Sequence, residues 1–206
     1  MTDLRLRTPC TIIVTSGSQG GKTHLVSELL LQRNSFTSAF REIKWVYAQH
    51  AGDKELFSRL SHLPIEFIEG YPDVAITDNT LFKSDKSVQK LLVLDDILTV
   101  PRRIDSLLNL FNILCHHQNI SVILTVQNLS GTAPSQKSCL NTLLRSCNYL
   151  VIFVNRRMIP IVKFIACNFF SEDKDRVLIP YTSVLRTQRP YAYFVFDFVT
   201  EVERLQ

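Results

Sequence analysis

Side chains suited to phosphate chemistry stand in a glycine-rich stretch near the start of the sequence. The stretch consists of Ser16, Gly17, Ser18, Gln19, Gly20, Gly21, Lys22 and Thr23, with His24 directly after it. Glycines allow consecutive backbone N–H groups to turn toward one point, where they bind phosphate oxygens. A lysine at this place reaches the outer phosphates, and a threonine hydroxyl is a ligand for Mg²⁺. We therefore expect residues 16–24 to bind ATP together with Mg²⁺.

This stretch departs from the usual phosphate-loop pattern at one position. The pattern is G-x-x-x-x-G-K-[ST], and Ser16 stands where its first glycine would be. We expect Gly17 and Gly20 to supply the missing flexibility. The alternative is a chance glycine turn. It is disfavoured because an apolar β-branched run, 11–15, precedes the loop and a helical pattern, 24–31, follows it.

Acidic and amide side chains end two further apolar runs. Asp95 and Asp96 close the run 90–96, and Gln127 follows the run 121–126. Continuous apolar runs favour parallel strands buried on both faces, and ligands of such sheets bind at the carboxyl ends of the strands. The sequence therefore predicts that these three side chains converge on the glycine-rich loop.

Each of these side chains has a predicted role. Asp95 is expected to hold Mg²⁺ together with Thr23, because Mg²⁺ prefers oxygen ligands. Asp96 is the candidate base that deprotonates an attacking water. Gln127 is expected to bind that water or the γ-phosphate. The alternative for the two acids is a turn or helix-capping pair, since Asp is common where strands end.

Hydrolysis of ATP also uses an arginine that neutralises charge on the γ-phosphate, and a neighbouring subunit can supply it. Three residues are candidates for this role. Arg156 and Arg157 follow the apolar run 149–154, and Arg145 lies in the helical pattern before it. The alternative for each is a solvated basic turn or a contact with a phosphate backbone.

The elements that must position these groups alternate between strand and helix patterns. Strands are predicted at 11–15, 43–47, 65–68, 90–96, 121–126, 149–154 and 191–198. Helices are predicted at 24–31, 54–60, 103–117 and 158–170, with a loop or short irregular helix at 70–87 and a loop at 130–138. Such alternation predicts an α/β fold with a mainly parallel sheet. Because no linker or repeat interrupts the chain, we expect residues 1–206 to form one domain.

Composition restricts the class of protein. The 206 residues are 46% hydrophobic and 20% charged, the balance of an ordinary globular domain. A net charge of +4 is compatible with a polyanionic partner. The five cysteines form no C-x-x-C pair, which favours a reducing compartment over a disulfide framework. No signal-peptide pattern or run of membrane-span length occurs, so we expect an intracellular protein that is neither secreted nor membrane-bound.

In order along the chain, these motifs resemble those of P-loop ATPases of the FtsK–HerA superfamily. The closer resemblance is to poxvirus-type genome-packaging ATPases, found in large DNA viruses and in virus-like Polinton or adintovirus elements. The segments that carry it are 16–23, 91–96, 116–129, 148–157 and 190–197. Segment 116–129 is the most specific, since these ATPases have a similar His-His-x-Asn-x-Ser-Val-Ile pattern running into Gln-Asn. In the family's Phe-x-Asn-Pro-Arg-Asp motif, Arg156 replaces the proline and Met158 the aspartate.

The resemblance implies a RecA-like (ASCE) sheet in which the Gln127 strand lies between the P-loop strand and the Asp95 strand. It implies a homo-oligomeric ring that pumps double-stranded DNA, without sequence preference, into a capsid. A capsid or portal protein would then be a further partner, in the host cytoplasm or nucleus. It also implies active sites at subunit interfaces, with Arg157 supplied in trans.

Two other functions remain open. A small P-loop kinase would need an arginine-rich lid, which is not evident, and the acids with Gln127 suit attack by water better. The second alternative is an assembly protein that binds nucleotide but hydrolyses it poorly. The departure from the usual loop pattern at Ser16 is compatible with this alternative. If the protein moves DNA, Lys137 in the 130–138 loop is a candidate phosphate contact.

Overall fold

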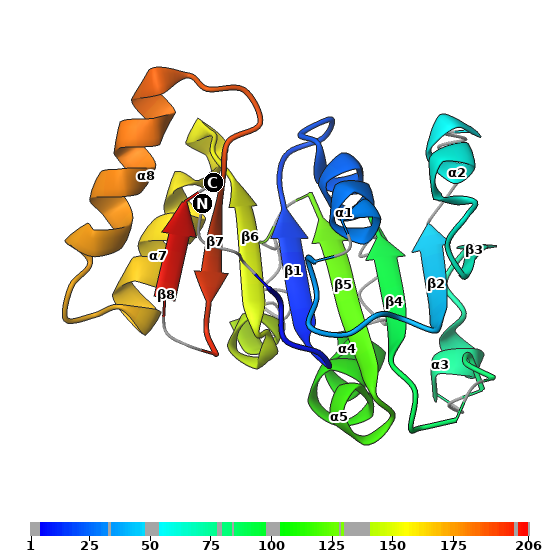
Figure 1. The fold of residues 1–206 in the computed structure, drawn as a ribbon. Coiled ribbons are helices and arrows are strands. Elements are labelled where there is room, and N and C mark those ends of the chain that lie inside the picture. Colours follow the sequence, from blue (N-terminus) through cyan, green and yellow to red (C-terminus); the bar gives the residue numbers. More distant parts are fainter. Residues whose placement is uncertain are drawn as a thin grey trace.

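The computed structural model describes residues 5–32, 34–47, 54–77, 80–83, 85–97, 104–127, 129, 141–199 and 202–205. Within these ranges one eight-stranded sheet runs in the order β3-β2-β4-β5-β1-β6-β7-β8 (Figure 1). Its strands are β1 (Thr11–Thr15), β2 (Glu42–Tyr47), β3 (Ile65–Glu69), β4 (Lys90–Asp95), β5 (Ile120–Val126), β6 (Tyr149–Phe153), β7 (Tyr193–Asp197) and β8 (Val202–Leu205).

The first six strands are parallel, and β7 and β8 continue the sheet in antiparallel pairing. The carboxyl ends of β1, β4 and β5 therefore lie at one edge, the upper edge in Figure 1. β5 separates β1 from β4. This order confirms the α/β, RecA-like architecture expected from the sequence.

Strand register brings the ends of these three strands to the same level. Thr15 of β1 pairs with Val126 of β5, and Asp95 of β4 pairs with Thr125. The residues that follow each strand consequently leave the sheet at neighbouring points. Side chains far apart in the sequence meet there because parallel pairing aligns the strand ends.

Helices cover both faces of the sheet (Figure 1). They are α1 (Lys22–Leu31), α2 (Lys54–Leu60), α3 (Asp73–Thr77), α4 (Ile104–Asn109), α5 (Cys115–His117), a helix over 141–146, α7 (Ile159–Phe169) and α8 (Asp175–Thr187). α1 and α2 pack on one face, in an apolar cluster that includes Ile12 and Val14. α3, α4, the 141–146 helix, α7 and α8 pack in a second cluster with Ile13, on the opposite face, because successive strand residues point to opposite sides.

Burial on both faces explains the continuous apolar runs of the central strands. Every residue of β1, β5 and β6 is buried, and in β4 only Asp95 is partly exposed. A parallel sheet covered by helices on both sides has no solvent face, so its strands show no polar alternation. These strands follow the predicted ranges closely for this reason.

Two elements near the carboxyl terminus were not predicted. In α8 only Val177 and Tyr181 are buried, and Pro180 lies inside the helix. The apolar residues of this segment do follow a helical period, but its polar composition and the internal proline, a helix breaker, disfavour a helix in the sequence. β8 is four residues long and pairs with β7 at the edge of the described sheet.

The predicted helix at 103–117 contains a π-helical turn at Leu110–Leu114, between α4 and α5. The predicted loop at 130–138, with Lys137, lies outside the described residues.

Two findings concern the general class of the protein. Across the parts of the chain with a described structure, no helix is both long and apolar enough to cross a bilayer. Of the described cysteines, Cys10, Cys115 and Cys147 are buried free thiols, and Cys167 is an exposed one. Burial raises the pKa of Cys10 and of Cys115 to about 12.

Candidate functional site

The glycine-rich loop joins β1 to α1 in a conformation suited to binding an anion. Gln19 (φ 58°) and Gly21 (φ 88°) are in the left-handed region, and Gly20 between them is not. Backbone that alternates in this way turns successive N–H groups toward one point. α1 begins at Lys22, and the N–H of Leu25 donates to the Gly21 carbonyl at 2.9 Å. The loop thus presents the free N–H groups and positive dipole end of a helix.

Ser16 is accommodated by a close approach to Gly20. Its side chain is buried, and its hydroxyl donates to the Gly17 carbonyl at 3.2 Å. A Cβ placed on Gly20 would lie 1.5 Å from the Ser16 Oγ. Neither Gly17 nor Gly20 has a left-handed φ, so what Gly20 supplies is space and not unusual backbone conformation. The left-handed φ that the loop needs comes from Gln19 and Gly21 instead.

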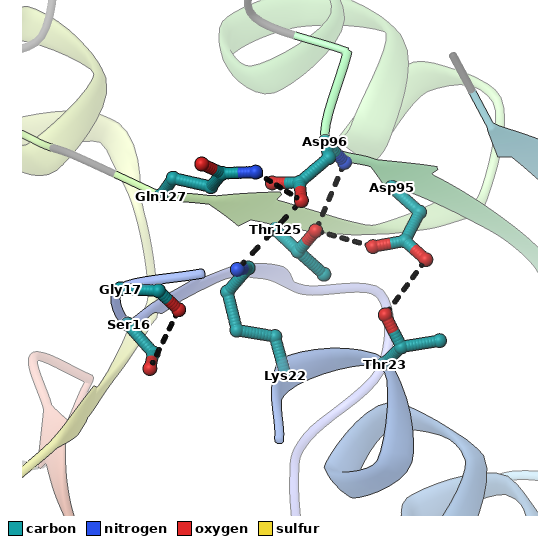
Figure 2. A network of polar contacts seen from close by, with 8 residues as sticks. All are labelled: Ser16, Gly17, Lys22, Thr23, Asp95, Asp96, Thr125 and Gln127. Atoms are coloured by element: carbon teal, nitrogen blue, oxygen red, sulfur yellow. Dashed lines mark hydrogen bonds and ion pairs between the residues drawn. The ribbon is translucent and has the colours of Figure 1, made fainter. Parts of the chain in front are cut away.

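Lys22 and Asp96 face each other across the site (Figure 2). The Lys22 Nζ lies 3.7 Å from Asp96 Oδ2, and only 5% of the lysine side chain is exposed. Gln127 Nε2 donates to the same Asp96 oxygen at 2.9 Å. Asp96 has a φ of 53°, a conformation that Asp and Asn tolerate better than most residues. The carboxylate thereby balances the buried lysine charge.

Thr23 and Asp95 meet on the other side of Lys22 (Figure 2). The Thr23 hydroxyl donates to Asp95 Oδ2 at 3.0 Å, and the Thr125 hydroxyl donates to Asp95 Oδ1 at 2.5 Å. Burial raises the pKa of the Asp95 carboxyl, and the nearby Asp96 charge adds to this rise. The two hydroxyl groups and Lys22 act in the opposite direction, because they stabilise the charged form.

This donor set fits Mg²⁺ held with a nucleotide. Thr23 and Asp95 offer adjacent hard oxygen atoms, which Mg²⁺ prefers over nitrogen or sulfur. Among the residues with a described placement, no cluster of three or more His, Cys, Asp or Glu side chains could hold a metal by itself. Mg²⁺ commonly binds through one or two protein ligands plus phosphate and water, so the fit requires no larger cluster.

Thr125 is a site residue that the sequence did not single out. Besides donating to Asp95, its hydroxyl accepts the Asp96 backbone N–H at 3.0 Å. It therefore orients both acids from the neighbouring strand. The available signal was a threonine two residues before Gln127 in a mostly apolar buried run.

A cavity of about 520 Å³ lies beside these groups. Its lining consists of Gln19, Gly20, Gly21, Lys22, Thr23, His24, Ser27, Glu55, Leu56, Arg59 and Asp96. The wall contributed by α2, with Glu55, Leu56 and Arg59, was not predicted from the sequence. Nothing in the spacing relates α2 to the glycine-rich loop, because only the packing of α2 beside α1 places it there.

The candidate arginines lie elsewhere. Arg156 and Arg157 are exposed on a short 3₁₀ turn, Arg156–Met158, after β6. β6 adjoins β1 on the side opposite β5, so this turn lies across β1 from the acids. Arg145 lies 5.8 Å from the Phe169 ring centroid, a cation–π distance that gives it a structural contact. The structure thus brings together Lys22, Thr23, Asp95, Asp96 and Gln127, and leaves the role of Arg157 as a prediction.

Comparison of the sequence with protein-family models and with curated proteins finds no match. Several solved structures are similar in fold. ATPases 2 and 3 of Thermomonospora curvata EccC, in complex with a signal sequence peptide, share 11% identity (TM-score 0.49); the match covers 72% of this chain and 30% of that one. KaiC-like protein PH0186 from Pyrococcus horikoshii shares 14% identity (TM-score 0.46; 71% of this chain and 73% of that one).

The assembled ATPase EscN from the type III secretion system of enteropathogenic E. coli shares 16% identity (TM-score 0.45; 76% of this chain and 45% of that one). The chain spans less than a third of the EccC structure. With these identities and with TM-scores below 0.5, no activity or partner is transferred from these proteins to this chain.

Proposed function

We propose that this chain hydrolyses ATP and uses the reaction to move double-stranded DNA in the packaging of a viral or virus-like genome. The observation that carries the hydrolysis is the convergence of five side chains where β1, β4 and β5 end. These are Lys22, Thr23, Asp95, Asp96 and Gln127. A phosphate loop, an oxygen pair for Mg²⁺ and an acid beside an amide are the parts that attack by water on a γ-phosphate needs.

Each residue has a step in the proposed reaction. The loop N–H groups and Lys22 bind the phosphates, so the lysine exchanges its 3.7 Å contact with Asp96 for the nucleotide. Thr23 and Asp95 would hold Mg²⁺, which neutralises phosphate charge when bound. Asp96, freed from the lysine, accepts a proton from water as the water oxygen attacks the γ-phosphorus and the bond to the bridging oxygen breaks. Gln127 orients that water.

The DNA part of the proposal rests on the family resemblance, above all on the segment 116–129. A net charge of +4 is compatible with contact to DNA phosphates. We further propose a homo-oligomeric ring, with a capsid or portal protein as partner and a place inside the host cell. Binding of DNA through its phosphates would be independent of base sequence and weakened by salt.

An ATPase assay with and without double-stranded DNA tests the proposal. We expect DNA to stimulate phosphate release by the wild type, and Lys22→Ala to abolish that release. Asparagine tolerates the left-handed φ of residue 96, so Asp96→Asn should leave the loop in place and still bind ATP. Its turnover should fall about 10²–10⁴-fold, the contribution of a positioned general base.

Other outcomes separate the alternatives. Transfer of phosphate to a small acceptor, with no effect of DNA, would replace the translocase by a kinase. Tight ATP binding with negligible release at any DNA concentration would favour the assembly protein. Turnover by Asp96→Asn close to that of the wild type would remove this residue as the base.

A further inference from the structure

The part of the cavity wall that α2 contributes carries two charged side chains, Glu55 and Arg59. Leu56 and Leu60 of α2 are buried in the same apolar cluster as Val26 of α1. This packing anchors α2 beside α1. Arg59 lies on the cavity side of α2 and lines the same space as Lys22 and Asp96. A cation from an element outside the phosphate loop thus shares the cavity with the groups expected to handle the terminal phosphate.

The present partner of Arg59 can be exchanged at little cost. Its Nη2 contacts Glu28 Oε1 of α1, and the two side chains are 39% and 35% exposed. An ion pair this open to water contributes little to stability. A guanidinium bound to phosphate makes shorter, charge-assisted and commonly bidentate hydrogen bonds. A triphosphate in the cavity would therefore compete well with Glu28.

The charges that line the cavity would also favour a further cation beside a bound triphosphate. Lys22 faces Asp96, and Glu55 lies on the cavity wall one helical turn before Arg59. A nucleoside triphosphate adds three to four negative charges, about one more than a diphosphate. Without Arg59, the described side chains that α2 contributes to the cavity lining would be Glu55 and Leu56, which offer no positive charge to the phosphates.

We propose that Arg59 is a cis-acting binding residue for the terminal phosphate of a nucleoside triphosphate, and that it leaves Glu28 when that phosphate enters. The assignment rests on the proposed nucleotide site and adds to it a contact that distinguishes triphosphate from diphosphate. It concerns the same subunit that supplies the phosphate loop, and is separate from any arginine supplied in trans.

Equilibrium binding of fluorescent ATP and ADP analogues, with Mg²⁺ and the full chain, tests the assignment. Arg59→Ala should weaken triphosphate binding about tenfold or more and change diphosphate binding less than about twofold. Glu28→Gln releases the arginine and should strengthen triphosphate binding. That gain should disappear in the double variant with Arg59→Ala, because it acts only through the arginine. Ser58→Ala, exposed on the same helix, is the matched control.

The outcomes separate this assignment from the proposed function. Wild type that binds neither analogue would overturn both. Wild type that binds both, with Arg59→Ala weakening neither or weakening both equally, would overturn the Arg59 assignment alone. A Glu28→Gln gain that persists without Arg59 would do the same. Should Arg59→Ala fail to fold, Arg59→Gln and the Glu28→Gln cycle carry the same test.

Discussion

At the scale of single residues, the phosphate loop depends on the Ser16 side chain and on the space that glycine leaves for it at position 20. Ser16 occupies the position at which this motif usually has glycine, and its hydroxyl lies where a Cβ on residue 20 would be. The two positions are therefore coupled sterically. The left-handed φ values belong to Gln19 and Gly21, so the departure at Ser16 leaves the anion-binding conformation of the loop intact.

The coupling predicts a specific double-variant result. Gly20→Ala would place its Cβ 1.5 Å from Ser16 Oγ, so we expect nucleotide affinity to fall at least about tenfold, in line with the cost of overpacking. Adding Ser16→Gly removes that clash and should restore most of the affinity. A titration of a fluorescent nucleotide measures both effects.

Gly17→Ala is the matched control. Apart from its own chain neighbours, no heavy atom lies within 4 Å of a Cβ on Gly17, and its φ is not left-handed. This variant should therefore lose less nucleotide affinity than Gly20→Ala does, and Ser16→Gly should have no clash to relieve in it. Equal losses from alanine at positions 17 and 20, or no rescue by Ser16→Gly, would contradict the steric coupling.

At the scale of elements, helix α8, which the sequence did not predict, contacts Asn155 at the start of the turn that carries Arg156 and Arg157. The Tyr181 hydroxyl of α8 donates to the Asn155 carbonyl at 2.9 Å and accepts the Asn155 N–H at 3.1 Å. Asn155 Oδ1 in turn accepts the N–H of Arg157 at 3.0 Å. α8 therefore positions the connection from β6 to α7, and with it Arg157.

Removing this hydroxyl should loosen the turn. Tyr181→Phe keeps the buried ring and leaves both backbone groups of Asn155 without that partner, which costs about 1–3 kcal/mol. Urea unfolding should show this loss. Nucleotide binding should be unchanged, and DNA-stimulated hydrolysis should fall if Arg157 acts in the reaction.

Tyr191→Phe serves as the control, because that residue is 70% exposed. Its unfolding free energy should differ from the wild type by less than about 0.5 kcal/mol. A Tyr181→Phe protein as stable as this control would show that the hydroxyl does not hold the turn.

At the scale of the whole molecule, the sheet order separates two groups of functional residues. The acids and Gln127 follow β4 and β5 on one side of β1, whereas Arg157 follows β6 on the other side. An exposed arginine that lies on the other side of β1 from the acids is suited to acting on a neighbouring subunit. The proposed ring would supply that neighbour.

Mixing of two inactive variants tests this arrangement. Lys22→Ala lacks the phosphate-binding lysine, and Arg157→Ala lacks the proposed trans arginine. In an equal mixture that exchanges subunits, about a quarter of the interfaces would combine an intact Lys22 with an intact Arg157. Phosphate release should therefore rise well above that of either variant alone.

Subunit exchange is checked first, with differently labelled wild-type proteins. If exchange occurs and the mixture is no more active than the average of its components, Arg157 does not act in trans. Activity of Arg157→Ala alone at the wild-type rate would remove the residue from the reaction altogether.

The sequence by itself determined the local parts of this protein. The glycine-rich loop, the buried strands and the polar residues that end them are visible because each is set by neighbours a few positions away. The strand-end residues predicted that the acids and Gln127 meet the loop, and the family resemblance implied the position of β5 between β1 and β4, which the sheet order confirms. The tertiary structure alone set Thr125 opposite Asp95 and brought Arg59 to the cavity. It also placed Tyr181 on Asn155. These contacts depend on how strands pair and helices pack over long sequence separations, and no local pattern encodes them.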